Sequence, residues 1–313
     1  MARPRVLVTS ATVAELVRLS PEEYDVAVLT DHADRDAWLD ANGAGITALV
    51  CSGMERLDAE RLALLPDLQL ISVIAAGMAG IDLAEAQRRG IAVTNAGDIN
   101  AGDVADFAIT LLLAHRRDLL ASDAWVREGR WVKSRMPLGR SIAAERIGIV
   151  GLGHIGRAVA ERLQPFSCEI RWWGRSAKPD AGWAREESLT ELARWATTLV
   201  IAVAGSNDTR ELIDRPVLEE LGPEGLLVNV ARGFVVDEEA LKDLLRAGRL
   251  GGAALDVVAH EPDDGTGWAD VPRVILAPHV AGSTRDALGA VVAGAADNVR
   301  RLFAGEPLLR RVT

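Results

Sequence analysis

Short apolar runs alternate with amphipathic stretches in the first part of the chain. Four of these runs have the length and composition of strands: Arg5–Val8, Val26–Leu29, Ala48–Cys51 and Leu70–Ile74. Between them, apolar residues recur at helical spacing in Ala11–Leu19, Ala33–Ala41 and Asp58–Leu65. Strands that alternate with helices in this way predict a parallel sheet with helical crossover connections.

A second alternating series begins at Arg146. It contains six runs typical of strands: Ile147–Val150, Glu169–Trp173, Leu199–Val203, Leu226–Val230, Ala253–Val257 and Val274–Ala277. Helical stretches such as Ile155–Gln164 and Asp237–Ala247 separate them. Strands with helical crossovers in this number are what a complete dinucleotide-binding sheet requires. The pattern therefore predicts an α/β protein with two doubly wound parallel-sheet domains.

Two longer helical stretches indicate how the chain passes between these domains. The first, Ala101 to about Arg127, is apolar on most faces, so we expect it to be buried between domains or subunits. The second, Arg285 to Phe303, closes the chain and is expected to return to the first domain. This arrangement predicts a Rossmann-type dinucleotide-binding domain at residues 98–284, inserted in a flavodoxin-like substrate-binding domain at residues 1–97 and 285–313.

Composition narrows the class of protein. The chain has 313 residues and a net charge of −10, which argues against a protein that binds nucleic acid through its phosphate backbone. The longest uncharged stretches, 41–54 and 68–81, have 14 residues each, below the ~20 needed to span a bilayer. Because the first residues run directly into a predicted strand, we expect no signal peptide. Because Cys51 and Cys168 both lie in apolar stretches, we expect free thiols in a cytoplasmic protein without a membrane partner.

A glycine-rich turn follows the first strand of the second series. Its sequence, Gly151-Leu152-Gly153-His154-Ile155-Gly156, fits G-x-G-x-x-G and opens a helix. In this context the first glycine permits the tight turn, the second lets the backbone approach a pyrophosphate, and the third allows close helix–strand packing. The amides at the start of the helix would face the phosphates. The turn therefore predicts a dinucleotide site.

The end of the next strand indicates which dinucleotide is bound. NAD sites usually carry an acid about 20 residues after the turn, to hold the ribose 2′-OH. Here the strand Glu169–Trp173 ends in Gly174-Arg175-Ser176, without an acid. Arg175 can pair with a 2′-phosphate, and Ser176 can donate a hydrogen bond to it. We therefore predict NADP(H) as the cofactor, with NAD(H) as the less favoured alternative.

Three polar residues follow the last three predicted strands. Arg232, Glu261 and His279 each lie just beyond the carboxyl end of a strand. Ligands of open α/β sheets bind outside these ends, so the three side chains are candidates for one catalytic group. Taken singly, each also fits an ordinary role, as a surface charge, a turn residue and a structural histidine respectively.

In this order and context, the motifs resemble those of the D-isomer-specific 2-hydroxyacid dehydrogenases. The similarity runs from about Leu70 to the C-terminus. It includes Ile91–Asn95, Asp103–Asp106, the glycine turn and the segments that carry the three polar residues, 229–241, 251–262 and 277–284. Within the family, the chain looks most like the glyoxylate/hydroxypyruvate and hydroxyphenylpyruvate reductases. The run Gly174-Arg175-Ser176 supports this placement. The resemblance implies an oxidoreductase that transfers hydride from NADPH to a small 2-keto acid and gives the D-2-hydroxy acid.

The resemblance also implies roles for individual residues. Arg232 would hold the substrate carboxylate or carbonyl oxygen, His279 would protonate that oxygen, and Glu261 would orient His279 and stabilise its imidazolium form. His279 and the whole glycine turn would contact the cofactor, together with Gly174, Arg175, Ser176, Val203, Ala204, Thr209, Val230, Ala231, Asp256, Ala281 and Gly282. No group of His, Cys and Asp residues has metal-ligand spacing, so no metal is predicted.

The stretch Ala75–Asp82 occupies the position of the family's substrate loop. Ala76 and Gly77 match the positions whose backbone amides receive the substrate carboxylate. Ser52 and Gly53 are candidates for another wall of the substrate pocket, with an ordinary loop as the equal alternative. Ala79 and Gly80 replace a usual Asp and a larger polar residue, so we expect a more flexible loop or a roomier pocket.

Family members pair through the cofactor domain, so the resemblance implies a homodimer, and the apolar stretch 101–127 suits such an interface. Two other functions stay open. One is a nucleotide-binding scaffold similar to the C-terminal-binding corepressors, which share this fold but would turn over no keto acid. The other is hydride transfer from a different donor, such as formate or phosphite.

Overall fold

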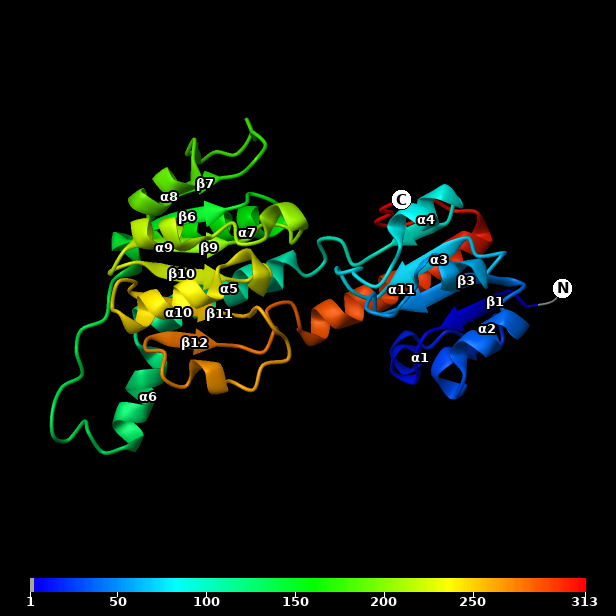
Figure 1. The fold of residues 1–313 in the computed structure, drawn as a ribbon, viewed down its shortest axis with the longest axis horizontal. Helices are drawn as coiled ribbons and strands as arrows, with labels where there is room; N and C mark the ends of the chain where they lie inside the picture. The colour runs from blue at the N-terminus through cyan, green and yellow to red at the C-terminus, as the bar shows by residue number, and fades with distance from the viewer. Residues whose placement is uncertain (1–2) are drawn as a thin grey trace. The chain divides into compact units, whose positions relative to one another are not determined.

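The computed structural model describes residues 3–313, and these residues form two compact units (Figure 1). Unit 1 comprises the chain up to Asn100 together with Arg285–Thr313, and unit 2 comprises Ala101–Thr284. The units therefore divide after Asn100, where the sequence analysis set the boundary after residue 97. Each unit has helices on both faces of a parallel sheet. The predicted fold class is confirmed.

Unit 1 is built on a parallel sheet with the strand order β2-β1-β3-β4-β5 among its described residues. This is a doubly wound order of the flavodoxin type. The strands are β1 (Arg5–Val8), β2 (Asp25–Val28), β3 (Ile46–Cys51), β4 (Leu70–Val73) and β5 (Ala92–Thr94). The helices are α1 (Ala11–Val17), α2 (Arg35–Asn42), α3 (Ala59–Ala63), α4 (Leu83–Arg88), α11 (Arg285–Ala304) and the 3-10 helix η1 (Leu29–Asp31).

Side chains from the helices of unit 1 fill both faces of its sheet. Leu39, Leu62 and Ala86 bring α2, α3 and α4 against one face. Val13 of α1 and Val299 of α11 pack against the other, with residues of β1, β3 and β4. The last helix thus belongs to the core of unit 1, as Figure 1 shows in red and orange beside the blue strands.

Helix starts in unit 1 follow directly from the sequence. α1, α2, α3 and α4 each begin after a short polar residue whose side chain accepts a hydrogen bond from the backbone amide three residues on; these caps are Ser10, Asp34, Asp58 and Asp82. Such a cap satisfies one of the amides that the first helical turn leaves without a partner. Each cap therefore fixes the end of the loop that leads into the helix.

Unit 2 is built on a parallel sheet with the order β12-β11-β10-β9-β6-β7-β8 among its described residues. The strands are β6 (Arg146–Val150), β7 (Glu169–Trp173), β8 (Ala184–Arg185), β9 (Thr198–Ile201), β10 (Leu226–Asn229), β11 (Gly252–Leu255) and β12 (Val274–Leu276). The chain builds outward from β6 in one direction and then from β9 in the other. A reversal of this kind creates the crevice in which doubly wound sheets bind ligands.

Two helical layers cover the sheet of unit 2. α5 (Ala101–Arg116) and α7 (His154–Leu163) lie on one face, and α8 (Leu189–Trp195), α9 (Arg215–Leu221) and α10 (Glu238–Arg246) lie on the other. Short 3-10 helices occupy the connections: η2 (Ile142–Ala144), η3 (Gln164–Phe166), η4 (Asn207–Thr209), η5 (Gly233–Val235) and η6 (Thr266–Trp268). Because the strands are parallel, their carboxyl ends meet at one edge.

The predicted single helix from Ala101 to Arg127 is wrong. The structure has two helices, α5 and α6 (Leu119–Arg127), and Asp118 between them is left-handed with φ 48°. An apolar pattern does not reveal such a break, because Asp is one of the residues that tolerate this conformation without a glycine. α5 is buried along much of its length, whereas α6 buries none of its residues. α5 is buried within unit 2, against its sheet and α7, whereas the expected burial between domains or subunits stays a prediction.

Neither a membrane span nor a metal centre is found among residues 3–313. None of their helices is both long enough and apolar enough to cross a bilayer. Their His, Cys, Asp and Glu side chains form no group of three or more that could hold a metal ion.

Candidate active site

The glycine turn lies between the carboxyl end of β6 and the start of α7, as its sequence predicts. Gly151 has φ +93°, and a Cβ atom there would lie 2.7 Å from Cγ1 of Val203. A Cβ on Gly153 would meet nothing within 4 Å, so the space above this residue is open. The turn therefore has the tight bend and the accessible backbone that a pyrophosphate needs. On this observation the residues fit a dinucleotide.

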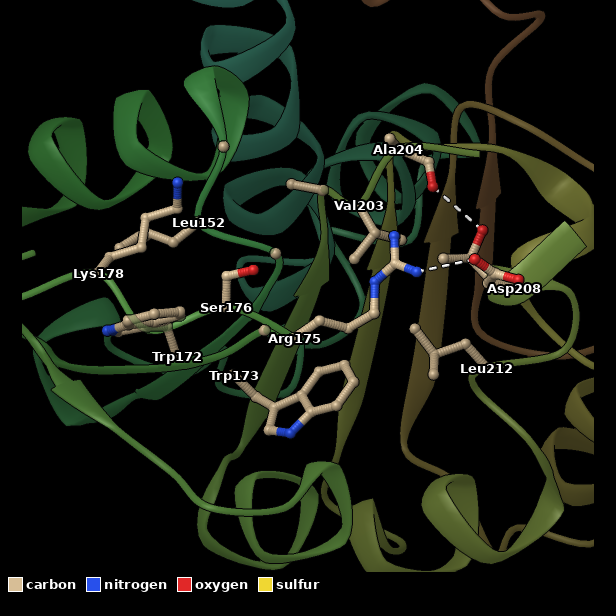
Figure 2. A pocket seen from close by; sticks show the side chains of 15 residues that line it. Leu152, Trp172, Trp173, Arg175, Ser176, Lys178, Val203, Ala204, Asp208 and Leu212 are labelled. Atoms are coloured by element: carbon tan, nitrogen blue, oxygen red, sulfur yellow. Dashed lines mark hydrogen bonds and ion pairs between the residues drawn. The ribbon is translucent and has the colours of Figure 1, made fainter. Parts of the chain in front are cut away.

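A cavity of ≈ 230 Å³ lies beside the turn, at the carboxyl ends of β6, β7 and β9 (Figure 2). Nine of the predicted cofactor residues line it: Gly151, Leu152, Gly153, Gly174, Arg175, Ser176, Val203, Ala204 and Thr209. Trp172, Trp173, Lys178, Ala202, Asp208 and Leu212 complete the lining. The other predicted cofactor residues are not in the lining: His154, Ile155, Gly156, Val230, Ala231, Asp256, His279, Ala281 and Gly282.

Asp208 is a lining residue that the sequence analysis did not select. It lies in η4, after β9, and one of its oxygens is 2.9 Å from Nη1 of Arg175. The sequence could have indicated Asp208, because an acid in the loop after a parallel strand lies at the same edge of the sheet as the glycine turn. It was missed because the search for an acid was restricted to the end of the second strand.

Arg232 lies between β10 and η5, as the residue immediately before this short helix. Its Nη1 donates to the carbonyl of Ala231 at 2.6 Å, and no carboxylate within residues 3–313 forms an ion pair with it. Gly205 lies against its side chain, since a Cβ at that position would be 2.6 Å from Cγ of Arg232. The guanidinium therefore keeps donors for an anionic ligand.

Asn229 holds the turn that carries Arg232. Its side-chain amide nitrogen donates to the carbonyl of Arg232 at 3.1 Å, and its oxygen accepts from the amide of Ala231 at 3.0 Å. Asn229 is buried at the end of β10. It is a positioning residue that the sequence analysis did not select.

His279 and Glu261 form a direct pair. Nδ1 of His279 lies 2.6 Å from Oε2 of Glu261, and the other oxygen of Glu261 accepts from the amide of Val258 at 3.2 Å. With Nδ1 bonded to the carboxylate, Nε2 is the ring nitrogen left for a substrate. The pair therefore has the geometry of a proton donor held in one orientation.

Asp256 fixes the loop that presents His279. Its two carboxylate oxygens accept from the amides of Val280 and Ala281 at 2.8 and 3.0 Å, and its carbonyl accepts from the amide of His279 at 2.8 Å. His279 itself has φ 53°, which is uncommon for a residue other than glycine. Asp256 is only 2% exposed. The structure thus gives this residue a positioning role, beside the cofactor contact that the resemblance implies.

In unit 1, the donors of Ser52 and Gly53 are already taken. The amide and hydroxyl of Ser52 and the amide of Gly53 all donate to the carboxylate of Glu55, which also accepts from the hydroxyl of Thr9. These groups therefore do not offer free donors to a substrate. By contrast, the amides of Ala76 and Gly77 have no hydrogen-bond partner within residues 3–313.

Gly80 gives close packing where the sequence analysis expected a flexible loop or a roomier pocket. Its amide donates to the carbonyl of Gly53 at 3.0 Å, and its carbonyl accepts from the amide of Leu57 at 2.8 Å. A Cβ atom at this position would collide with the backbone of Met54 and Glu55. The small residue therefore lets two loops pack together.

The chain belongs to the D-isomer specific 2-hydroxyacid dehydrogenase family. The model of the NAD binding domain of that family matches residues 109–281. This span contains the glycine turn, Arg232, Glu261 and His279. The protein is accordingly an oxidoreductase with a dinucleotide-binding domain.

Curated relatives of the chain are reductases. It is 37% identical over 282 residues to glyoxylate/hydroxypyruvate reductase A of Arabidopsis thaliana, with 89% of each chain covered. It is 37% identical to a 2-ketogluconate reductase of Gluconobacter oxydans, over 85% of this chain and 86% of the relative. It is 38% identical to a hydroxyphenylpyruvate reductase of Plectranthus scutellarioides, over 90% of both.

Solved structures agree with this assignment. A 2-hydroxyacid dehydrogenase from Ketogulonicigenium vulgare superposes with a TM-score of 0.94 and 37% identity, covering 100% of this chain and 99% of the other. An NADPH-dependent glyoxylate/hydroxypyruvate reductase from Sinorhizobium meliloti, solved with NADP and malonate, gives a TM-score of 0.88 and 33% identity, covering 100% and 97%.

Proposed function

We propose that the protein reduces small 2-keto acids, such as glyoxylate or hydroxypyruvate, to D-2-hydroxy acids with NADPH. The observation that carries the proposal is the His279–Glu261 pair, 2.6 Å apart, at the strand edge that also presents Arg232. β10, β11 and β12 are neighbours, and Arg232, Glu261 and His279 follow them in that order. The curated relatives named above are reductases of such acids.

In this proposal the chemistry is divided among three side chains. NADPH, when bound, supplies the hydride. Arg232 binds the carboxylate of the keto acid through its fork of donors and so orients the carbonyl. His279 gives a proton from Nε2 to the carbonyl oxygen, while Glu261 keeps the ring in place through Nδ1. We further propose that the amides of Ala76 and Gly77 receive the substrate carboxylate in an anion-binding turn.

The preference for NADPH over NADH rests on the cavity beside the glycine turn. Arg175, Ser176 and Lys178 line it, and the end of β7 carries no acid to repel a 2′-phosphate. The related reductase from Sinorhizobium meliloti was solved with NADP. We expect higher kcat/KM with NADPH than with NADH, and equal values with the two would contradict this preference.

A keto-acid panel tests the proposed activity directly. We expect NADPH to be consumed with glyoxylate or hydroxypyruvate, and Arg232→Ala to lower kcat/KM by ~10²–10³ because an oriented charged donor is lost. Arg249→Ala is the matched control, since Arg249 is an exposed arginine paired with Glu219. Full activity of Arg232→Ala would contradict the assignment. A protein that binds NADPH but turns over no keto acid would instead be a nucleotide-binding scaffold.

We also propose that the protein is a homodimer that pairs through unit 2. The segment from α6 to residue 138 carries exposed apolar side chains, with Val132 and Leu138 exposed by 89% and 97%. In Figure 1 this segment projects from the rest of unit 2. Apolar groups gathered on one projecting segment favour burial against a second copy. A monomeric mass in light scattering at micromolar concentration would exclude this assembly.

A further inference from the structure

Two oppositely charged side chains meet at the cavity beside the glycine turn. Arg175 comes from the loop after β7, and Asp208 comes from η4 after β9. Nη1 of Arg175 lies 2.9 Å from Oδ2 of Asp208, and the two side chains are 64% and 74% exposed. Figure 2 shows the carboxylate of Asp208 facing the guanidinium. The pair therefore lies where a dinucleotide would bring its adenosine ribose.

The backbone around Asp208 is held in place. The amide of Ser206 donates to Oγ1 of Thr209 at 2.9 Å, and the same hydroxyl donates to the carbonyl of Ala204 at 3.1 Å. The first bond ties the amide of the residue before η4 to the last residue of this helix, and the second ties that residue back to the end of the loop after β9. Asp208 is thus presented to Arg175 from a fixed short helix, and a substitution of its side chain leaves this framework intact.

We propose that Asp208 moderates the cofactor selectivity of the site, by reducing a preference for NADPH that Arg175 creates. The proposal rests on the function proposed above, in which this cavity holds a nicotinamide dinucleotide. Asp208 competes with a 2′-phosphate for Arg175, and it offers an acceptor to the 2′-hydroxyl of a cofactor that lacks this phosphate. It therefore takes, from a different loop, the place of the acid missing at the end of β7.

The charges account for both effects. A ribose 2′-phosphate carries about −1.5 to −2 charges at neutral pH, so it attracts Arg175 but is repelled by a carboxylate already beside it. An ion pair this exposed is weak, so a phosphate can displace Asp208. A hydroxyl, in contrast, needs an acceptor, and a carboxylate is a strong one. Asp208 thus moderates a preference for NADPH that Arg175 creates.

Binding of nucleotide fragments tests this role without any turnover. The ligands are adenosine 2′,5′-bisphosphate, which carries the 2′-phosphate, and ADP, which carries a 2′-hydroxyl. Calorimetry on the full chain compares the wild type with Asp208→Asn and Arg175→Ala. We expect Asp208→Asn to raise the ratio of the two dissociation constants, ADP over bisphosphate, by about three- to fivefold at low salt.

The control variant is Asp243→Asn, because Asp243 forms a similarly exposed pair with Arg215, also at 2.9 Å, outside the cavity. It should leave the ratio unchanged, and both variants should keep the wild-type melting temperature. An unchanged or lower ratio in Asp208→Asn would overturn the proposal. If the ratio did not rise in Asp208→Asn but Arg175→Ala abolished the preference for the bisphosphate, the role of Asp208 would be wrong and NADPH would remain the proposed cofactor. A wild type that binds neither ligand would overturn both.

Discussion

At the scale of single residues, carboxylates placed beside backbone amides organise both units. Asp256 binds two amides of the loop after His279, and Glu55 binds the amides of Ser52 and Gly53. Burial alone would raise the pKa of Glu55, but the hydrogen bonds from the Thr9 and Ser52 hydroxyls and the nearby amides outweigh it and lower that pKa. All four bonds to Glu55 require acceptors, which a charged carboxylate supplies on both oxygens.

Replacing Glu55 tests this organisation. In Glu55→Gln, one oxygen becomes an NH₂ group that faces donors, so we expect a loss of ~1–3 kcal/mol in the free energy of unfolding at neutral pH. Because the folded pKa lies below the unfolded value of about 4.3, the carboxylate stabilises the fold above that pH and loses this effect as the pH falls through its folded pKa. The gap between wild type and variant should therefore shrink below about pH 4.3.

Urea denaturation at neutral pH and near pH 4 measures the free energy of unfolding of the wild type and of Glu55→Gln. Glu60→Gln serves as the control, since Glu60 is an exposed acid in a surface pair with Arg56. A gap of the same size at both pH values would mean that the charge of Glu55 does not stabilise the loop. The same variant can also be assayed with a keto acid. If loops 52–57 and 75–81 act together in binding, KM should change more than kcat.

At the scale of elements, the apolar pattern predicted ten of the strands among residues 3–313 and missed β5 and β8. β3 and β10 were found because their runs are continuous and apolar, as expected for strands covered on both faces. β5 and β8 have three and two residues and were not selected as strands; they are recognised from their pairing with β4 and β7. The break at Asp118 was hidden because apolar residues continue on both sides of it.

The same limit applies to the site. Arg232, Glu261 and His279 could be predicted because each follows a strand, and parallel strands bring their carboxyl ends together. Asp208, Asn229 and Glu55 were not selected, because their roles depend on which groups they meet in space. A sequence motif identifies residues that do chemistry more readily than those that hold them in place.

One buried ion pair between elements was also beyond prediction. Arg116 at the end of α5 and Glu145 before β6 lie 2.9 Å apart and are almost fully buried. Hydroxyls of Thr197 and Thr198 donate to the same carboxylate at 2.7 and 2.8 Å. These bonds offset the cost of burying the two charges. They fix α5 at the amino ends of β6 and β9, opposite the edge that carries the site.

At the scale of the whole molecule, the chain combines two parallel-sheet units, each with its own hydrophobic core. Unit 2 holds the glycine turn, the cofactor cavity and the three proposed catalytic residues. In unit 1, the amides of Ala76 and Gly77 have no hydrogen-bond partner within residues 3–313. A reductase needs both a positioned proton donor and a bound dinucleotide. The part of the chain that matches the 2-hydroxyacid dehydrogenase family contains the glycine turn and the His279–Glu261 pair.

The most direct test of the account is the rate of a single turnover in His279→Gln. Enzyme loaded with NADPH is mixed with hydroxypyruvate, and the loss of NADPH absorbance is followed, with NADPH affinity measured separately. We expect hydride transfer to slow by ~10²–10⁴ while NADPH still binds, because only the proton donor is lost. His260→Gln, at an exposed neighbouring histidine, should match the wild type. A rate for His279→Gln close to that of the wild type would contradict the assignment of His279 as the proton donor.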